Sequence, residues 1–328
     1  MKKIIYFIVL SALVLYILFF PEPAVAAASF GLMLWYSKML PTILPFAILS
    51  HILVSSELLS NAANTIHKPL ARILPVSAAG IYPLFAGFLF GFPLGSRITA
   101  QMVAEGQMDW EEGNRLFVVC NNISPIFISS FILSDSLKRP ELKAVTLMLL
   151  YLPPLCYLWL DQRLPDVKQR DRKLPDVRRR DRQRHIPDNP PAVPRVKKTA
   201  SRSQINFRII DAGIMSGFET LTRLGGYIML FAILAQMTTC IPHLPKLAGC
   251  MLVGLTEITN GIAALASLQL PFTLKYPAII ACTAFGGLSG LAQTASMTRE
   301  AGFSMTHYVK VKLVLSLVSA ALAMLAAR

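Results

Sequence analysis

The chain has 328 residues, of which 54% are hydrophobic and 15% are charged, and its formal net charge is +14. Several apolar stretches approach the roughly 20 residues that a helix needs to cross a bilayer, so we expect an all-α, polytopic integral membrane protein. The five cysteines have no metal-type C-x-x-C spacing, which predicts neither a disulfide framework nor a metal site. The sequence also shows no nucleophile–base pair and no phosphate-binding loop, and we expect no enzymatic activity and no cofactor.

The first apolar segment, Ile4 to Phe20, follows two lysines at the N-terminus. Ala24-Val25-Ala26 comes shortly after it, so a cleaved signal peptide is one interpretation. The apolar run is long for a signal core, and we expect an uncleaved helix whose N-terminus lies inside. Further apolar segments follow at 30–59, 78–105, 116–134, 142–160, 224–240, 247–269, 276–298 and 308–328, with an amphipathic stretch at 209–222.

A basic segment, 161–208, separates the apolar segments into two groups. It contains 15 Lys and Arg against 6 Asp, which gives 15 − 6 = +9, and it repeats the pattern Leu-Pro-Asp-Val with charged residues behind it. Such a composition cannot bury enough apolar surface to fold, so we expect a disordered linker. The positive-inside rule favours a cytoplasmic loop that attracts anionic lipid headgroups over a nucleic-acid-binding segment.

These charges constrain how the chain threads the membrane. With both the N-terminus and the linker inside, the helices of the first group make two round trips only if 78–105 enters and leaves on one side, as a re-entrant hairpin. The second group then starts from the opposite side, which predicts two inverted-topology repeats. We expect this division: 1–29, an N-terminal transmembrane helix; 30–160, the first repeat; 161–208, the linker; 209–328, the second repeat.

Two distant stretches share the pattern G-x3-G-x3-T-A-x-M-x2-E. One begins at Gly91 and the other at Gly286, and both interrupt apolar segments. Duplicated, glycine-broken segments in the two halves of a membrane protein are the best pointer to a transporter's binding site. We therefore interpret both as re-entrant hairpins whose tips bind substrate, with helix packing as the alternative interpretation.

Three polar clusters inside apolar segments are candidate sites, because buried polar groups in a membrane are costly. At the hairpin tips, exposed helix N-termini and the guanidinium of Arg97 can bind an anion. In the second cluster Pro125 frees a backbone carbonyl near residue 121 beside two amides and a hydroxyl. In the third cluster a carboxylate at membrane depth can couple transport to Na⁺ or H⁺, or orient Arg97. The predicted substrate-binding residues are Gly91, Pro93, Gly95, Arg97, Asn121, Asn122, Ser124, Gly287, Ser289, Gly290 and Gln293, and the coupling or structural residues are Glu257, Thr259 and Asn260.

Four stretches of the sequence resemble the YlbJ-type sporulation integral membrane proteins of the nucleoside-recognition, or Gate, domain superfamily. They are Gly31 to Phe46, Gly91 to Thr99, Asn121 to Phe127 and Glu257 to Gly261. The resemblance covers the chain except for the basic linker. It implies a role in stage V sporulation, in which dipicolinic acid is moved across the outer forespore membrane. The superfamily also includes the concentrative nucleoside transporters.

We therefore expect a multi-pass protein of the cell membrane or outer forespore membrane, with the linker in the cytoplasm, that transports a small organic anion such as dipicolinate. Cation-coupled nucleoside transport is one alternative. A non-transporting scaffold of a sporulation complex, docked through its linker, is another. The expected partners are the anion, the lipid bilayer, and either further copies of the chain or other sporulation membrane proteins, with no nucleic acid.

Overall fold

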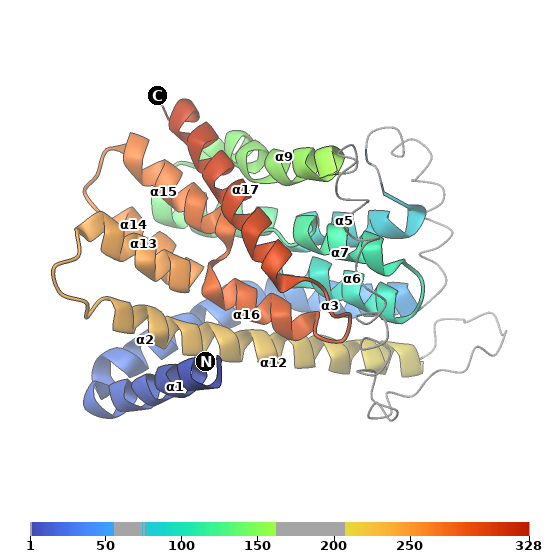
Figure 1. Ribbon diagram of the computed structural model, residues 1–328, viewed down its shortest axis with the longest axis horizontal. Helices are drawn as coiled ribbons and strands as arrows, with labels where there is room; N and C mark the ends of the chain where they lie inside the picture. Colours follow the sequence, from blue (N-terminus) through green and yellow to red (C-terminus); the bar gives the residue numbers. More distant parts are fainter. Residues whose placement is uncertain (1, 56–73, 75, 162–206, 328) are drawn as a thin grey trace.

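The computed structural model describes residues 2–55, 74, 76–161 and 207–327, and within them it is helical with no strand (Figure 1). The linker prediction therefore falls almost wholly outside the described residues. Among these residues, five segments are long and apolar enough to cross a bilayer: Pro21–Leu53, Pro140–Asp161, Phe207–Thr238, Phe272–Met297 and Met305–Ala326. Large apolar side chains on their outer faces are exposed, as in a chain that lies in lipid. The protein is thus a polytopic all-α membrane protein, as predicted.

The two longest helical segments pack side by side and run in opposite directions (Figure 1). The first consists of α2 (Pro21–Leu34), the π-helical η1 (Trp35–Met39) and α3 (Leu40–Ser55). The second, α12 (Phe207–Thr238), is one continuous helix, so the predicted boundary between an amphipathic stretch and a helix near 223 is wrong. Gly31 faces Ala232 whereas Gly213 faces Ile48, which fixes the antiparallel register. Small residues at these crossings let the two helices approach closely.

A helical hairpin follows the first long segment, as predicted for 78–105. α5 (Ala78–Phe90) turns at Gly91 and returns as α6 (Leu94–Ala104), and the two helices pack against each other. A side chain on Gly95 would place its Cβ 2.5 Å from the Cα of Gly87 and would overlap the carbonyl of Cys120. The hairpin can therefore close only because both crossing positions are glycine.

A second hairpin lies at 246–267, where the sequence left open whether the chain crosses or turns back. α13 (Lys246–Thr256) ends at Glu257, and α14 (Ile258–Ser267) folds back along it. A Cβ on Gly261 would overlap the backbone of Gly254. The chain therefore turns back, and a glycine pair again marks the crossing.

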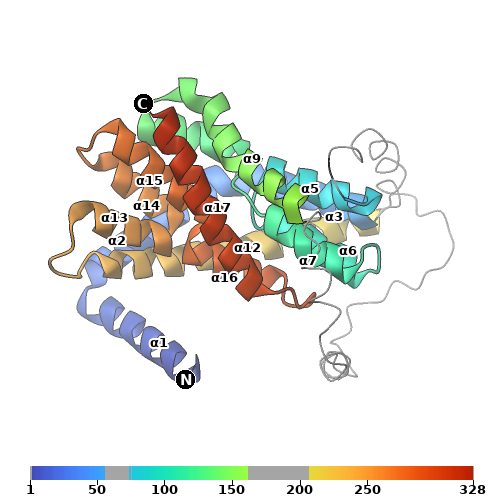
Figure 2. The same cartoon turned by 45° about the horizontal axis from the view of Figure 1, so that its top comes forward.

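Two further helices are broken without folding back. α7 (Trp110–Val119) is followed by an irregular stretch at 120–124, then by α8 (Pro125–Phe127) and the π-helical η2 (Ile128–Leu137). α15 (Phe272–Phe285) breaks at Gly286, and α16 (Gly287–Met297) leads away from it (Figures 1 and 2). The predicted hairpin at 276–298 is therefore wrong, whereas the predicted helix at 116–134 is interrupted at the place where Pro125 was expected to free a backbone carbonyl. α15 and α16 do not pack along each other, and Pro125 cannot donate a helical hydrogen bond to residue 121.

The remaining helices complete the bundle. The 3₁₀ turn η3 (Pro140–Leu142) leads into α9 (Lys143–Asp161), and α17 (Met305–Ala326) packs against α9 and α15. α1 (Lys2–Phe19) lies at the edge, against α2 and α12. Each half of the described chain thus has the order long helix, hairpin, broken helix, single helix. In this order the α5–α6 hairpin of the first half corresponds to the α13–α14 hairpin of the second. The two copies of the glycine pattern lie in the α5–α6 hairpin and at the break between α15 and α16, so they are not in equivalent elements.

Candidate functional site

A cavity of about 260 Å³ lies where both hairpin tips and both helix breaks meet. Phe90, Gly91 and Phe92 of the first tip form part of its wall, and Glu257 lies at the second tip. The breaks contribute Ser124 at the start of α8, and Ser289, Gly290 and Gln293 in the first turns of α16. η1 and α3 close another side with Ser37, Lys38, Met39, Thr42 and Ile43. We call this the outer cavity. It is mostly apolar with a few convergent polar groups, the usual character of a small-molecule site.

The carboxylate of Glu257 is buried at the wall of the outer cavity, with 1% of the residue exposed. Its Oε2 accepts a hydrogen bond from the backbone N–H of Asn260 at 2.9 Å and another from the Thr259 hydroxyl. Glu257 is thereby the N-cap of α14, where the helix dipole favours a negative charge. These two donors explain how an acid can lie at this depth without a basic partner among the described residues.

The first turns of α16 face the same cavity. Gln293 is 2% exposed, and its Nε2 donates to the Ser289 hydroxyl at 2.8 Å. Its Oε1 is buried with no partner among the described residues. Gly286, the N-cap of α16, cannot cap it with a side chain. The helix therefore presents uncapped backbone donors and an amide with unused capacity beside the cavity.

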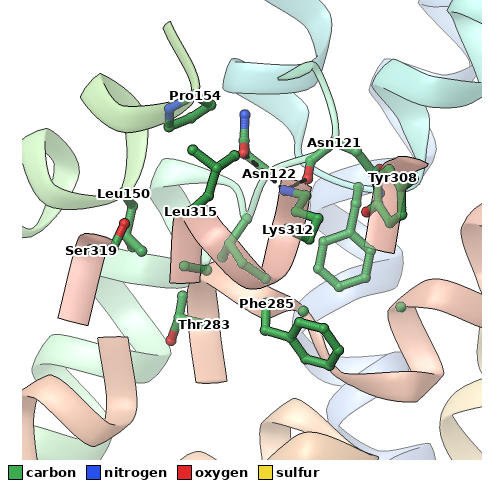
Figure 3. A pocket seen from close by; sticks show the side chains of 15 residues that line it. Asn121, Asn122, Leu150, Pro154, Thr283, Phe285, Tyr308, Lys312, Leu315 and Ser319 are labelled. Carbon is green, nitrogen blue, oxygen red and sulfur yellow. Dashed lines mark hydrogen bonds between the residues drawn. The ribbon is translucent and has the colours of Figure 1, made fainter. Parts of the chain in front are cut away.

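A second, smaller cavity of about 20 Å³ lies behind the first, and Figure 3 shows it. We call it the inner cavity. Six polar residues line it: Asn121, Asn122, Thr283, Tyr308, Lys312 and Ser319. Lys312 is 3% exposed, and its Nζ donates to the Asn121 carbonyl at 2.6 Å and to Asn122 Oδ1 at 3.3 Å. An ammonium group thus lies deep in the bundle, at the carboxyl end of α7.

The broken stretch of α7 is held by hydrogen bonds to its own freed carbonyls. Asn121 O accepts from Lys312, as expected four residues before a proline. Asn122 O accepts from the Phe92 N–H at 2.6 Å, and Ile123 O accepts from the Tyr151 hydroxyl at 2.7 Å. The first hairpin tip is therefore docked onto the break, and the irregular backbone is satisfied inside the protein.

The side chains of Asn121 and Asn122 link helices to one another. Asn121 Nδ2 donates to the Thr294 hydroxyl at 2.7 Å and to the Tyr308 hydroxyl, and its Oδ1 accepts from Ser96 at 3.2 Å. Asn122 Nδ2 donates to the Val119 carbonyl at 2.6 Å. Both amides therefore support the architecture in this conformation while they line the inner cavity.

Several predicted site residues lie elsewhere. The guanidinium of Arg97 points to α12, where Nη1 donates to the Ser216 carbonyl at 3.3 Å and Arg97 also binds the hydroxyls of Ser216 and Thr220. Arg97 lines neither cavity, and neither do Pro93, Gly95, Gly287, Thr259 and Asn260. Gly91, Ser124, Ser289, Gly290, Gln293 and Glu257 do come together around the outer cavity. The sequence could not show that the Arg97 side chain turns towards α12.

Two lysines at the cavities were missed. Lys312 lies near the start of the last apolar segment, and the sequence analysis did not single it out. Lys38 lines the outer cavity and pairs with Asp135 at 3.2 Å, joining η1 to η2. A basic residue within an apolar segment is the signal that would have identified Lys312.

The chain is 23% identical to the sporulation integral membrane protein YlbJ of Bacillus subtilis over 331 aligned positions. The alignment covers 93% of this chain and 78% of that protein. No family model matches the chain, and no solved structure matches it. The alignment runs through both halves of the bundle, so the chain is similar to that sporulation integral membrane protein along nearly its whole length.

Proposed function

We propose that this protein is a transporter of a small organic anion and acts in the membranes of a sporulating cell. The observation that supports this most is the position of the outer cavity, at the meeting point of two hairpin tips and two helix breaks. Secondary transporters bind substrate at such points, near the middle of the bilayer and between their repeats. A non-transporting scaffold has no need for a cavity there.

The surroundings of the outer cavity favour an organic anion that contains a ring. The first turn of α16, which has no side-chain cap, lies at its wall, and helix N-termini attract negative charge. Phe90, Phe92 and Phe127 supply aromatic surface on which a planar ring can stack. At about 260 Å³ the cavity is near the small end of the range for ligand sites, roughly 300–1,000 Å³.

Within this class we propose dipicolinate, a planar pyridine ring with two carboxylates. The relative's name places that protein in sporulation, and the family resemblance of this chain implies dipicolinate as the cargo. The cell membrane and the outer forespore membrane are the proposed locations, with the linker in the cytoplasm. Coupling to Na⁺ or H⁺ through Glu257 is part of the proposal.

One observation favours a second candidate, cation-coupled nucleoside transport. Glu257 and the unused Gln293 Oε1 both present acceptors at the outer cavity, and acceptors suit the hydroxyls of a sugar. An ionised Glu257 would also repel a dicarboxylate unless a cation or proton neutralises it.

Binding of radiolabelled dipicolinate to the purified full-length protein, with uridine as competitor, separates the candidates. Saturable binding that uridine does not displace is the expected result. Uridine binding without dipicolinate binding would assign the chain to nucleoside transport. Binding of neither compound would leave the scaffold as the better explanation. Deletion of 162–206 with a short replacement linker should then abolish the sporulation role of a scaffold, whereas it should spare a transporter.

A further inference from the structure

The ammonium group of Lys312 is buried, and no acidic side chain among the described residues pairs with it. The three ion pairs among the described residues join Lys38 to Asp135, Arg139 to Glu141, and Arg223 to Glu219, so none involves Lys312. Its Nζ has two oxygen acceptors, both neutral, and lies 5.9 Å from the centre of the Tyr308 ring, whereas a lysine ammonium has three protons to donate. A buried charge that lacks an opposite charge is costly, and such groups within membranes are usually functional.

Lys312 is separated from the outer cavity by a thin partition. Phe92, Ile123 and Gly290 line both cavities, so they form the wall between them. The ring of Phe92 lies over Gly290, where a Cβ would be in van der Waals contact with it at 3.4 Å. Phe92 belongs to the first hairpin tip, which is held at this point by the hydrogen bond from its N–H to Asn122 O. A shift of that tip or a rotation of the ring would join the two cavities.

We propose that the two cavities form one binding site in which Lys312 binds a carboxylate of the substrate once Phe92 moves aside. The inference rests on the proposed function and deepens it. The ligand class is a planar aromatic dicarboxylate: its ring and one carboxylate lie in the outer cavity, that carboxylate beside the first turn of α16, and the second carboxylate reaches the inner cavity. The second carboxylate supplies a counter-ion for Lys312, and it accepts the remaining ammonium proton.

The size of the inner cavity is consistent with this order of events. About 20 Å³ holds roughly one water molecule, since about 10–15 Å³ is the minimum for one. A carboxylate is larger than a water molecule, so it enters only when the partition moves. The described conformation is therefore a closed state in which the ammonium is kept from the outer cavity.

A purely structural role is the competing explanation. Lys312 also closes the end of broken α7, because it binds the Asn121 carbonyl and lies where the helix dipole is negative. A structural lysine would affect the stability of the fold and the affinity for all ligands together. A lysine that binds one carboxylate would instead affect only ligands that carry that carboxylate.

The test compares dipicolinate with picolinate, which lacks the second carboxylate, on detergent-solubilised full-length protein. We expect the wild type to bind dipicolinate about tenfold or more tightly than picolinate, because of the charge-assisted contact. Lys312→Met should remove this preference while picolinate affinity stays nearly unchanged. Lys310→Met is the matched control, since Lys310 lies two residues earlier on α17 and is exposed, and it should keep the preference.

Lys312→Gln serves if the methionine variant does not fold, because its amide can still donate to the Asn121 carbonyl but carries no charge. Thermal unfolding and gel filtration show whether each variant is folded. A folded Lys312 variant that keeps the full preference for the dicarboxylate overturns the inference and leaves the proposed function standing. If the wild type binds neither ligand, the proposed function fails, and the inference fails with it.

Discussion

The α5–α6 and α13–α14 hairpins are both closed by a pair of glycines, but their tips carry different side chains. In each, a pair of glycines lets the two helices cross at backbone contact, Gly87 with Gly95 and Gly254 with Gly261. The first tip carries Phe92, which lines both cavities and is docked on the α7 break. The second tip carries the buried carboxylate of Glu257. The two hairpins therefore share a backbone arrangement but differ at their tips. The first tip lies between the two cavities, and the second places a carboxyl group at the outer cavity.

The glycine crossings should tolerate substitution least. Gly95→Val would force a side chain into Gly87 and the Cys120 carbonyl, and we expect a loss of stability above about 3 kcal/mol, enough to remove most folded protein. Gly254→Val should do the same in the second hairpin, because its Cβ would lie 2.7 Å from Cys282 Sγ. Monodisperse yield in detergent and thermal unfolding measure both effects.

Gly249→Ala is the matched control, because a Cβ at this position of α13 meets nothing within 4 Å. It should express and unfold like the wild type. A well-folded Gly95→Val protein would show that the hairpin crossing is not as tight as described.

Arg97, near the first tip, should act on stability rather than on substrate. Arg97→Ala removes the hydrogen bonds to Ser216 and Thr220 that connect α6 to α12, and we expect a loss of about 1–3 kcal/mol. Dipicolinate affinity of the folded fraction should stay within about twofold, a change of roughly 0.4 kcal/mol. Isothermal titration at a temperature where the variant is folded measures it. A large loss of affinity without a loss of stability would restore the direct role that the sequence suggested for Arg97.

Substitution of Glu257, at the second tip, should change the ion dependence of transport more than the stability of the protein. Glu257→Gln keeps an oxygen that can accept from the Asn260 N–H but removes the charge, so the cap of α14 should weaken by no more than about 1 kcal/mol. Dipicolinate affinity should hold or rise by up to about tenfold, because a like charge is removed. Dependence of transport on Na⁺ or H⁺ should decrease, and counting the coupled ions in proteoliposomes checks this. Unchanged coupling in the variant would place the coupling site elsewhere.

The ion pair between Lys38 and Asp135 should have the smallest effect. Both side chains are about half exposed, at 41% and 51%, so the pair should contribute less than about 1 kcal/mol to stability. Asp135→Asn frees Lys38 at the outer cavity and should accelerate capture of an anion at low salt, with the gain lost at high salt. Stopped-flow binding at two ionic strengths measures this. A rate that does not respond to salt would show that Lys38 does not attract the substrate.

Some of this arrangement was predictable from local chemistry. Pro125 determines that the Asn121 carbonyl loses its helical partner, and the structure shows that carbonyl bound by another group. Gly91 likewise marks the turn of the first hairpin, where its φ of 84° suits glycine. These conclusions depend on residues close in sequence, which is why the sequence was sufficient.

The remainder depends on contacts between distant segments. Gly286, in a helix that breaks and continues, and Gly91, in a hairpin that turns back, begin the same G-x3-G pattern. That difference depends on which helices pack against each segment. The side chain of Arg97 binds α12, more than 100 residues away in the sequence. The position of Lys312 beside the α7 break depends on the packing of α17 against that break. The outer cavity unites residues of both halves for the same reason.

Counterflow of radiolabelled dipicolinate in proteoliposomes tests the central claim most directly, because it requires both binding and movement of the substrate. Vesicles that hold the full-length protein and unlabelled dipicolinate should accumulate label, saturably, and excess external uridine should not compete. Protein-free vesicles and vesicles with Gly95→Val should not accumulate label. Folded wild-type protein that gives no counterflow above the protein-free level would contradict the assignment of this cavity to anion transport.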